Sequence, residues 1–102
     1  MLIRDLFNQK KRTLSFEVFP PVREGNLESL FATIAELEEL KPDFISVTYG
    51  AGGGTRDKTI EIASRVKNEI RSEALAHLTC VASSRDDIAR ILEDMKAQNI
   101  EN

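Results

Sequence analysis

Two patterns of apolar and polar residues alternate along this chain, one typical of β-strands and one typical of amphipathic helices. Short runs rich in β-branched and aromatic residues predict β-strands, and longer stretches with apolar residues every three or four positions predict amphipathic helices. The predicted strands cover residues 14–19, 44–48 and 75–81. The predicted helices cover residues 1–10 and 27–40, and two further helices begin after residues 55 and 83.

Local chemistry predicts where the helices begin and which side of each is buried. Asn26, Thr55 and Ser84 stand where an N-cap is needed, and Asp87 completes a capping-box-like pair with Ser84. Apolar residues at helical spacing mark the side of each helix that faces the core. In the three longer helices these residues are Leu27, Leu30, Phe31, Ile34, Leu37 and Leu40; Ile60, Ala63, Val66 and Ile70; and Ile88, Ile91, Leu92 and Met95. The helix predicted over residues 1–10 carries the apolar residues Leu2, Leu6 and Phe7.

The spacing of the strands indicates the class of fold. They begin about 30 residues apart, which is the length of one βα unit. Strands that alternate with amphipathic helices indicate an α/β fold with parallel strands and right-handed crossovers. Within each strand one side is apolar, and the other carries polar residues toward the carboxyl end. The residues on the polar sides are Ser15, Glu17 and Phe19; Ser46 and Thr48; and His77 and Thr79.

This one-sided polarity helps to choose between two architectures. Strands covered by helices on both faces of an open sheet are almost continuously apolar, although a binding crevice on such a sheet could imitate the pattern. A (β/α)8 TIM barrel opens into a polar site at the carboxyl ends of its strands, and this fits better. We therefore expect the first three βα units of such a barrel, preceded by a short N-terminal helix. With only the start of a fourth strand at Ile100, residues 1–102 are predicted to be a partial barrel domain, truncated before strand 4.

Composition narrows the class of protein further. The 102 residues carry 14 basic and 17 acidic side chains, a formal charge of −3, which argues against nucleic-acid binding and a polybasic membrane anchor. Apolar runs are only a few residues long, so no membrane span is predicted, and no secretion signal is visible. The single cysteine, Cys80, cannot form an internal disulfide, so we expect a reducing, cytoplasmic compartment.

Glu17 is the first candidate for chemistry. A carboxylate that faces a barrel lumen is costly unless it is paired or hydrogen-bonded. Desolvation there would raise the pKa of Glu17, which suits a general acid. Spacing alone favours equally a structural role, in which the carboxylate of Glu17 is only hydrogen-bonded to neighbouring polar groups.

Two further features lie at the same predicted edge. The glycine-rich segment from Tyr49 to Arg56 follows a strand and precedes a helix, where backbone N–H groups can meet an anion, but a plain βα loop is an equal alternative. His77, the only histidine, lies on the polar side of the third strand. No second ligand stands at metal-binding spacing, so a metal site is not expected. Cys80 falls on the apolar side, where we expect a small buried residue rather than a nucleophile.

Three motifs together resemble the methylenetetrahydrofolate reductase family. They are Ser15-Phe16-Glu17-Val18-Phe19-Pro20-Pro21, then Pro42-Asp43-Phe44-Ile45-Ser46-Val47-Thr48-Tyr49-Gly50-Ala51-Gly52-Gly53, then His77-Leu78-Thr79-Cys80. They occur in the order and at the spacing of the family, and the resemblance runs from Thr13 onward. Each motif alone is weak, whereas the three together are highly specific.

The resemblance implies a flavoenzyme of one-carbon and methionine metabolism. Such an enzyme uses NAD(P)H to reduce FAD and passes hydride to 5,10-methylenetetrahydrofolate, giving 5-methyltetrahydrofolate. The general acid of the family falls on Glu17, which would protonate the folate as its imidazolidine ring opens to the iminium. Nicotinamide and flavin contacts fall on Thr48, Tyr49 and Ala51, and a further FAD contact falls on His77. We also expect a homo-oligomeric parent enzyme.

The resemblance has departures and leaves alternatives. Val18 stands where many members carry an aromatic residue, and Gly54 replaces a common Ser or Thr. A Leu-Arg-Gly-Asp segment and later units, which supply most FAD and folate contacts in the family, are not in this sequence. We therefore expect a fragment that is inactive by itself. One alternative is a non-enzymatic module that self-associates through open strand edges. Another is a different barrel enzyme with a phosphorylated ligand at the glycine-rich loop.

Overall fold

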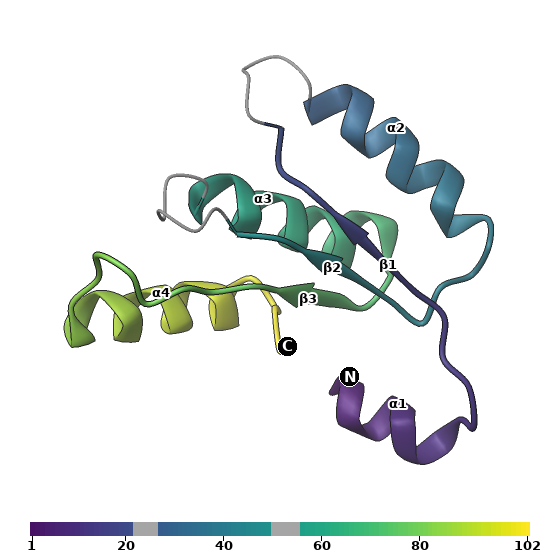
Figure 1. Ribbon diagram of the computed structural model, residues 1–102, viewed down its shortest axis with the longest axis horizontal. Helices are drawn as coiled ribbons and strands as arrows, with labels where there is room; N and C mark the ends of the chain where they lie inside the picture. Colours follow the sequence, from purple (N-terminus) through teal and green to yellow (C-terminus); the bar gives the residue numbers. More distant parts are fainter. Residues whose placement is uncertain (22–26, 50–55) are drawn as a thin grey trace.

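The computed structural model describes residues 1–21, 27–49 and 56–102 and contains an alternation of helices and strands. Figure 1 labels the elements in chain order. They are α1 (Ile3–Gln9), β1 (Ser15–Val18), α2 (Leu27–Glu38), β2 (Phe44–Val47), α3 (Arg56–Arg65), η1 (Val66–Ile70), β3 (Ala74–Ala76) and α4 (Arg85–Ala97). The short element η1 is a π-helical turn that continues α3. This order confirms the predicted βα repeat and the short N-terminal helix.

The three strands form one open parallel sheet in the order β1-β2-β3. Glu17 pairs with Ser46, and Ser46 pairs with Leu75, so these three residues form one row across the sheet. Side chains alternate between the two faces of a strand, and residues in one row share a face. Rows therefore alternate between a polar face, with Glu17 and Ser46, and an apolar face, with Val18 and Val47. This arrangement is consistent with part of a (β/α)8 barrel.

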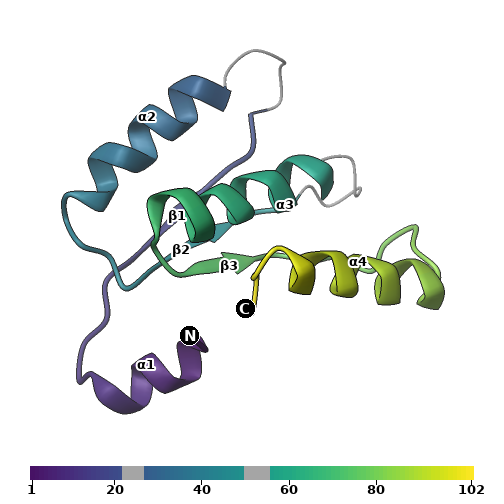
Figure 2. The same ribbon diagram turned by 180° about the vertical axis from the view of Figure 1, so that it is seen from behind.

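The core lies on the apolar face of the sheet, beneath the helices. Val47 and Ile45 of β2 are fully buried there, as are Ile34 of α2 and Ile62 of α3. Figure 2 shows α3 passing across this face, where it packs against β2 and β3. A cation–π contact joins α2 to α3: the guanidinium of Arg65 lies 3.5 Å from the ring centroid of Phe31. On the opposite, polar face the side chain of Glu17 is 49% exposed.

Several predicted boundaries and burials need correction. The third strand covers Ala74–Ala76 and not residues 75–81, because the chain turns away from β2 after one more backbone hydrogen bond, from the N–H of His77 to the C=O of Val47 at 3.0 Å. The helix predicted over 27–40 ends at Glu38, and Leu40 is 61% exposed. Leu92 of α4 is also exposed, since the contacts of α4 with the core are made by other residues of that helix. Helical periodicity predicts a face, but the limits of that face depend on the neighbouring elements.

The two ends of the chain meet at the amino ends of the strands (Figure 1). The N–H of Ile3 donates to Oδ1 of Asn102 at 2.8 Å, and Nδ2 of Asn102 donates to the C=O of Met1 at 2.9 Å. The N–H of Ala76 donates to the backbone oxygen of Asn102 at 2.9 Å, so residues after α4 return beside β3. That is the place where a fourth strand was predicted to start, although among the described residues the sheet has three strands and ends at β3.

An ion-pair cluster reinforces this end of the sheet. Nζ of Lys67 donates to both carboxylate oxygens of Glu73, at 2.9 and 2.8 Å, and lies 3.4 Å from Glu101. The amino group of Met1 also contacts Glu73 and Glu101, at 2.9 and 2.6 Å. Burial is the largest single influence and opposes the charge on Lys67, but the surrounding hydrogen bonds and the negative charge of Glu73 together outweigh it and raise the pKa of Lys67. These charges lie at the opposite end of the strands from the candidate site and hold the fold together.

Candidate functional site

Three polar side chains meet near the carboxyl ends of the strands. Oγ of Ser46 donates to Oε2 of Glu17 at 3.1 Å, and Nε2 of His77 lies 3.6 Å from the same oxygen. Glu17 belongs to β1, Ser46 to the central strand β2, and His77 follows β3. The parallel register places them on the same face, and the small side chain of Ser46 leaves room for His77 to approach Glu17. The structure thus brings two of the predicted site residues together.

Thr48 is placed at the same edge by backbone hydrogen bonds. Its N–H donates to the C=O of Val18 at 3.0 Å, which extends the β1–β2 ladder by one residue. Its C=O accepts the hydroxyl of Thr59 from the first turns of α3 at 2.9 Å. Thr48 and Tyr49 are both half-buried. Thr48 follows Ser46 by two residues, so it lies on the polar face in the next row, toward the carboxyl end.

Other predicted site features differ from expectation or lie outside the described residues. The side chain of Glu17 is 49% exposed, so the desolvation expected of a lumen carboxylate is not found in this chain. Cys80 is exposed and not buried, because the chain has left the sheet before it reaches this residue. Ala51 and most of the glycine-rich segment lie outside the described residues, as do the predicted caps Asn26 and Thr55. The capping box of Ser84 and Asp87 is confirmed.

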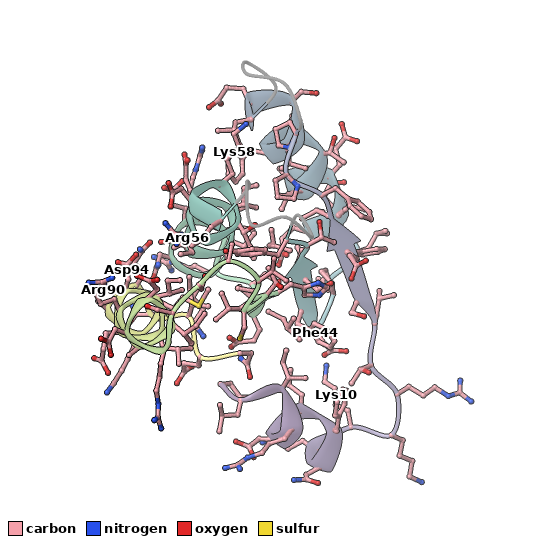
Figure 3. The ribbon with its side chains drawn as sticks, turned by 60° about the vertical axis from the view of Figure 1, so that its left-hand side comes forward. Lys10, Phe44, Arg56, Lys58, Arg90 and Asp94 are labelled. Atoms are coloured by element: carbon pink, nitrogen blue, oxygen red, sulfur yellow. The ribbon has the colours of Figure 1, made fainter. Side chains whose placement is uncertain are left out.

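Two grooves on the described part of the chain lie away from these residues. One groove of about 270 Å³ runs between α3 and α4, where Arg56, Arg90 and Asp94 gather on the helical side (Figure 3). A second, of about 540 Å³, lies at the amino ends of the strands and includes Lys67 and Lys96. Neither includes Glu17 or His77. At the candidate site the side chains of Glu17 and His77 are 49% and 40% exposed, so both are accessible to solvent.

Neither a metal-ligand cluster nor a membrane-spanning helix is found in the part of the chain that the structure describes. No group of three or more His, Cys, Asp or Glu side chains there could hold a metal ion. Within residues 1–21, 27–49 and 56–102, no helix has the length and apolar character that crossing a bilayer requires.

Ser46 is the residue to which sequence reasoning assigned no role. The alternation of the second strand placed it on the polar side, but nothing in the sequence states which residue of β1 it pairs with. The register pairs it directly with Glu17, and Ser46 is 8% exposed. One feature could have indicated this pairing: Glu17 and Ser46 occupy the same position within their strands, each being the third residue of four.

The chain is similar to one family of enzymes over nearly its whole length. The sequence model of the family described as Methylenetetrahydrofolate reductase matches residues 2–102. "Methylenetetrahydrofolate reductase (NADH) 1" of Arabidopsis thaliana is 40% identical over 100 residues, which cover 98% of this chain and 17% of that protein. "5,10-methylenetetrahydrofolate reductase" of Pectobacterium carotovorum is 43% identical over 86 residues, 84% of this chain and 29% of that protein.

The Escherichia coli protein named "5,10-methylenetetrahydrofolate reductase" shows the same relationship. It is 39% identical over 97 residues, which cover 89% of this chain and 33% of that protein. The chain thus spans between about a sixth and a third of the length of these three relatives. With a match from residue 2 to residue 102 and three parallel strands in the expected order, the chain belongs to the methylenetetrahydrofolate reductase family.

Proposed function

We propose that this chain forms the first three βα units of an FAD-dependent methylenetetrahydrofolate reductase that acts in the cytoplasm. In that enzyme NAD(P)H would be the reductant and 5,10-methylenetetrahydrofolate the substrate, with 5-methyltetrahydrofolate as the product. The observation that carries the proposal is the contact of Glu17 with Ser46 and His77 on the polar face. A carboxyl group beside a hydroxyl and an imidazole at this edge supports the proposal, because barrel enzymes act at the carboxyl ends of their strands.

The residues at this edge fit a flavin. A flavin ring presents carbonyl oxygens and N–H groups along its edge, so it needs both donors and acceptors from the protein. His77, 40% exposed, and the half-buried Thr48 offer such groups from neighbouring strands. We assign Thr48, Tyr49, Ala51 and His77 to cofactor binding. When bound, FAD would supply the hydride transfer from the nicotinamide nucleotide to the folate, while the protein positions the reactants.

Glu17 is proposed as the general acid. Its carboxyl group would give a proton to the folate nitrogen that is released as the imidazolidine ring opens, leaving an iminium ready to accept hydride. A group in this role must keep a defined orientation as well as its proton. The hydrogen bond from Ser46 supports such an orientation, and the half-exposed position of Glu17 leaves it accessible to a substrate.

By itself the chain is proposed to be inactive. Its polar face is covered by no helix or strand within the described residues, and the side chains of Glu17 and His77 are 49% and 40% exposed. Contacts from one face alone leave much of a ligand in water, whereas binding pockets bury most of it. The activity is therefore proposed for a protein that contains this segment together with the remaining units of a barrel.

The Glu17→Gln variant of a full-length reductase that contains this segment tests the proposal. Reduction of FAD by NAD(P)H should stay within about twofold of wild type, while folate reduction should fall by at least about 100-fold, as expected for loss of a general acid. Rapid-mixing spectroscopy of the flavin measures the two half-reactions separately. Glu36→Gln, an exposed glutamate of α2, is the control. Equal loss of both half-reactions in Glu17→Gln would mean that the glutamate is structural.

One observation favours the second candidate, self-association. Strand β1 is at an edge of the sheet, and Phe19 just beyond it is 67% exposed. An unpaired strand edge can pair with another copy of the chain. Sedimentation of the 102-residue protein distinguishes the candidates, since a compact monomer at all concentrations would exclude pairing through β1.

A further inference from the structure

The carboxylate of Glu17 is held from one side. Among the described residues, Ser46 and His77 both approach Oε2, at 3.1 and 3.6 Å, and no hydrogen bond or ion pair reaches Oε1. The two oxygens of this carboxylate are therefore not equivalent. One is turned toward β2 and β3, and the other remains for a different partner.

Ser46 is well placed to act as an anchor. It is 8% exposed and sits on the central strand, where pairing on both sides fixes its backbone. Its hydroxyl has two acceptors within reach, Oε2 of Glu17 at 3.1 Å and the C=O of Phe16 at 3.5 Å. A hydroxyl has one hydrogen to donate, and the carboxylate is both the closer and the stronger acceptor.

We propose that Ser46 is a positioning residue for Glu17, which holds Oε2 so that Oε1 is the atom that carries and delivers the proton. This inference rests on the proposed function. In the step concerned, the O–H bond at Oε1 breaks and its electron pair stays on the carboxylate. The proton goes to the folate nitrogen, which receives the electron pair of the C–N bond that breaks, and the ring carbon becomes the iminium carbon.

The proposed role differs from general acid catalysis by Ser46 itself. The hydroxyl keeps its own proton throughout and acts only through Glu17. Removing it leaves the acid in place but lets the carboxyl group rotate, so that the proton is less often aimed at the substrate. Loss of one such hydrogen bond should slow the step on the order of tenfold, and orientation affects the rate more than substrate binding.

The test uses three serine variants of a full-length reductase that contains this segment. In Ser46→Ala the kcat of folate reduction should fall about tenfold, with the folate KM within about twofold of wild type. Flavin reduction by NAD(P)H should be unchanged. Ser46→Thr keeps a hydroxyl on a residue type that suits a strand, and it should recover to within about threefold of wild type. Ser72→Ala is the matched control, because Ser72 is equally buried, at 6% exposure, but precedes the amino end of β3.

Each result has a defined meaning. Normal folate reduction in Ser46→Ala, when Glu17→Gln abolishes it, would overturn the anchoring role and leave the proposed function intact. Loss of both half-reactions together in Ser46→Ala, or no recovery in Ser46→Thr, would show a structural effect and also overturn it. Normal folate reduction in Glu17→Gln would refute the proposed function and this inference with it.

Discussion

Nε2 of His77 lies 3.6 Å from Oε2 of Glu17, although 60 positions separate the residues and a whole strand, β2, stands between theirs. The approach is possible because both side chains leave the same face of a parallel sheet, on either side of the small Ser46. At this edge a carboxylate and an imidazole therefore form one polar surface. The two residues that meet there come from the first and third strand segments of the chain.

His77 should contribute to the binding of FAD. In a full-length reductase that contains this segment, His77→Ala removes a hydrogen-bonding group of the proposed cofactor surface. The dissociation constant for FAD should rise by about tenfold, which corresponds to the loss of one good hydrogen bond. Fluorescence titration of the apoenzyme measures it. Asn8→Ala, on the exposed side of α1, is the control, and an unchanged FAD affinity in His77→Ala would contradict the assignment.

The 102-residue chain by itself should bind FAD at far less than one molecule per chain and should not oxidise NAD(P)H. The physical reason is the accessibility of the site, where Glu17 and His77 are 49% and 40% exposed on an open face. Absorbance of the purified protein in the flavin region, with a standard NADH oxidation assay, measures both. A stoichiometric yellow protein with turnover would contradict this prediction.

Glu73 and Glu101 should differ in their contribution to stability, although both contact Lys67 and the amino group of Met1. The side chain of Glu73 is 10% exposed and also accepts Nδ2 of Asn102 at 3.1 Å, whereas Glu101 is 50% exposed. Glu73→Gln leaves the partly buried Lys67 with a weaker partner and should lower the free energy of unfolding by about 2 kcal/mol.

Glu101→Gln is the matched variant for this comparison. It removes a solvent-screened pair and should cost clearly less, with an effect that disappears at high salt. Urea denaturation followed by circular dichroism measures both variants at low and high salt. Equal losses would contradict the role of burial.

Asp87 should make the stability of the chain dependent on acid pH. Its carboxylate accepts the N–H of Ser84 at 2.8 Å and the Ser84 hydroxyl at 2.7 Å, and it pairs with Arg90. These contacts, the backbone one first, lower the pKa of Asp87 from 3.8 to about 2. Because the unfolded chain binds the proton more tightly, the contribution is complete above the unfolded pKa and is lost as the pH falls toward about 2.

The comparison of Asp87→Asn with wild type measures this effect. Wild type should lose more stability than Asp87→Asn between about pH 4 and pH 2 in urea denaturation, because the variant has no carboxylate to protonate. Asp86→Asn, the neighbouring acid, should keep the wild-type dependence. Ser84→Ala, which removes the cap itself, should cost about 1 kcal/mol at neutral pH. Parallel curves for wild type and Asp87→Asn would contradict the prediction.

Much of the architecture follows from local sequence. The spacing of apolar residues predicted α2 and α4, and the capping box of Ser84 and Asp87 predicted that α4 begins near Ser84. Strict alternation predicted which face of each strand is polar, because neighbouring side chains of a strand point in opposite directions. These features depend on interactions within a few residues, which the sequence displays directly.

Tertiary structure decided what local patterns could not. The strand predicted through Cys80 ends at Ala76, and Leu92 is exposed at a helical position that predicted burial, since both depend on which elements lie alongside. The sequence alone indicated that Glu17 and Ser46 lie on the polar sides of their strands, and that His77 continues the polar side of the third, which ends one residue before it. Only the register of the parallel sheet decided that Ser46 pairs with Glu17 and that His77 reaches the same oxygen. Register depends on how strands that are distant in sequence align, and the local sequence of one strand does not specify which residue of the next strand lies opposite.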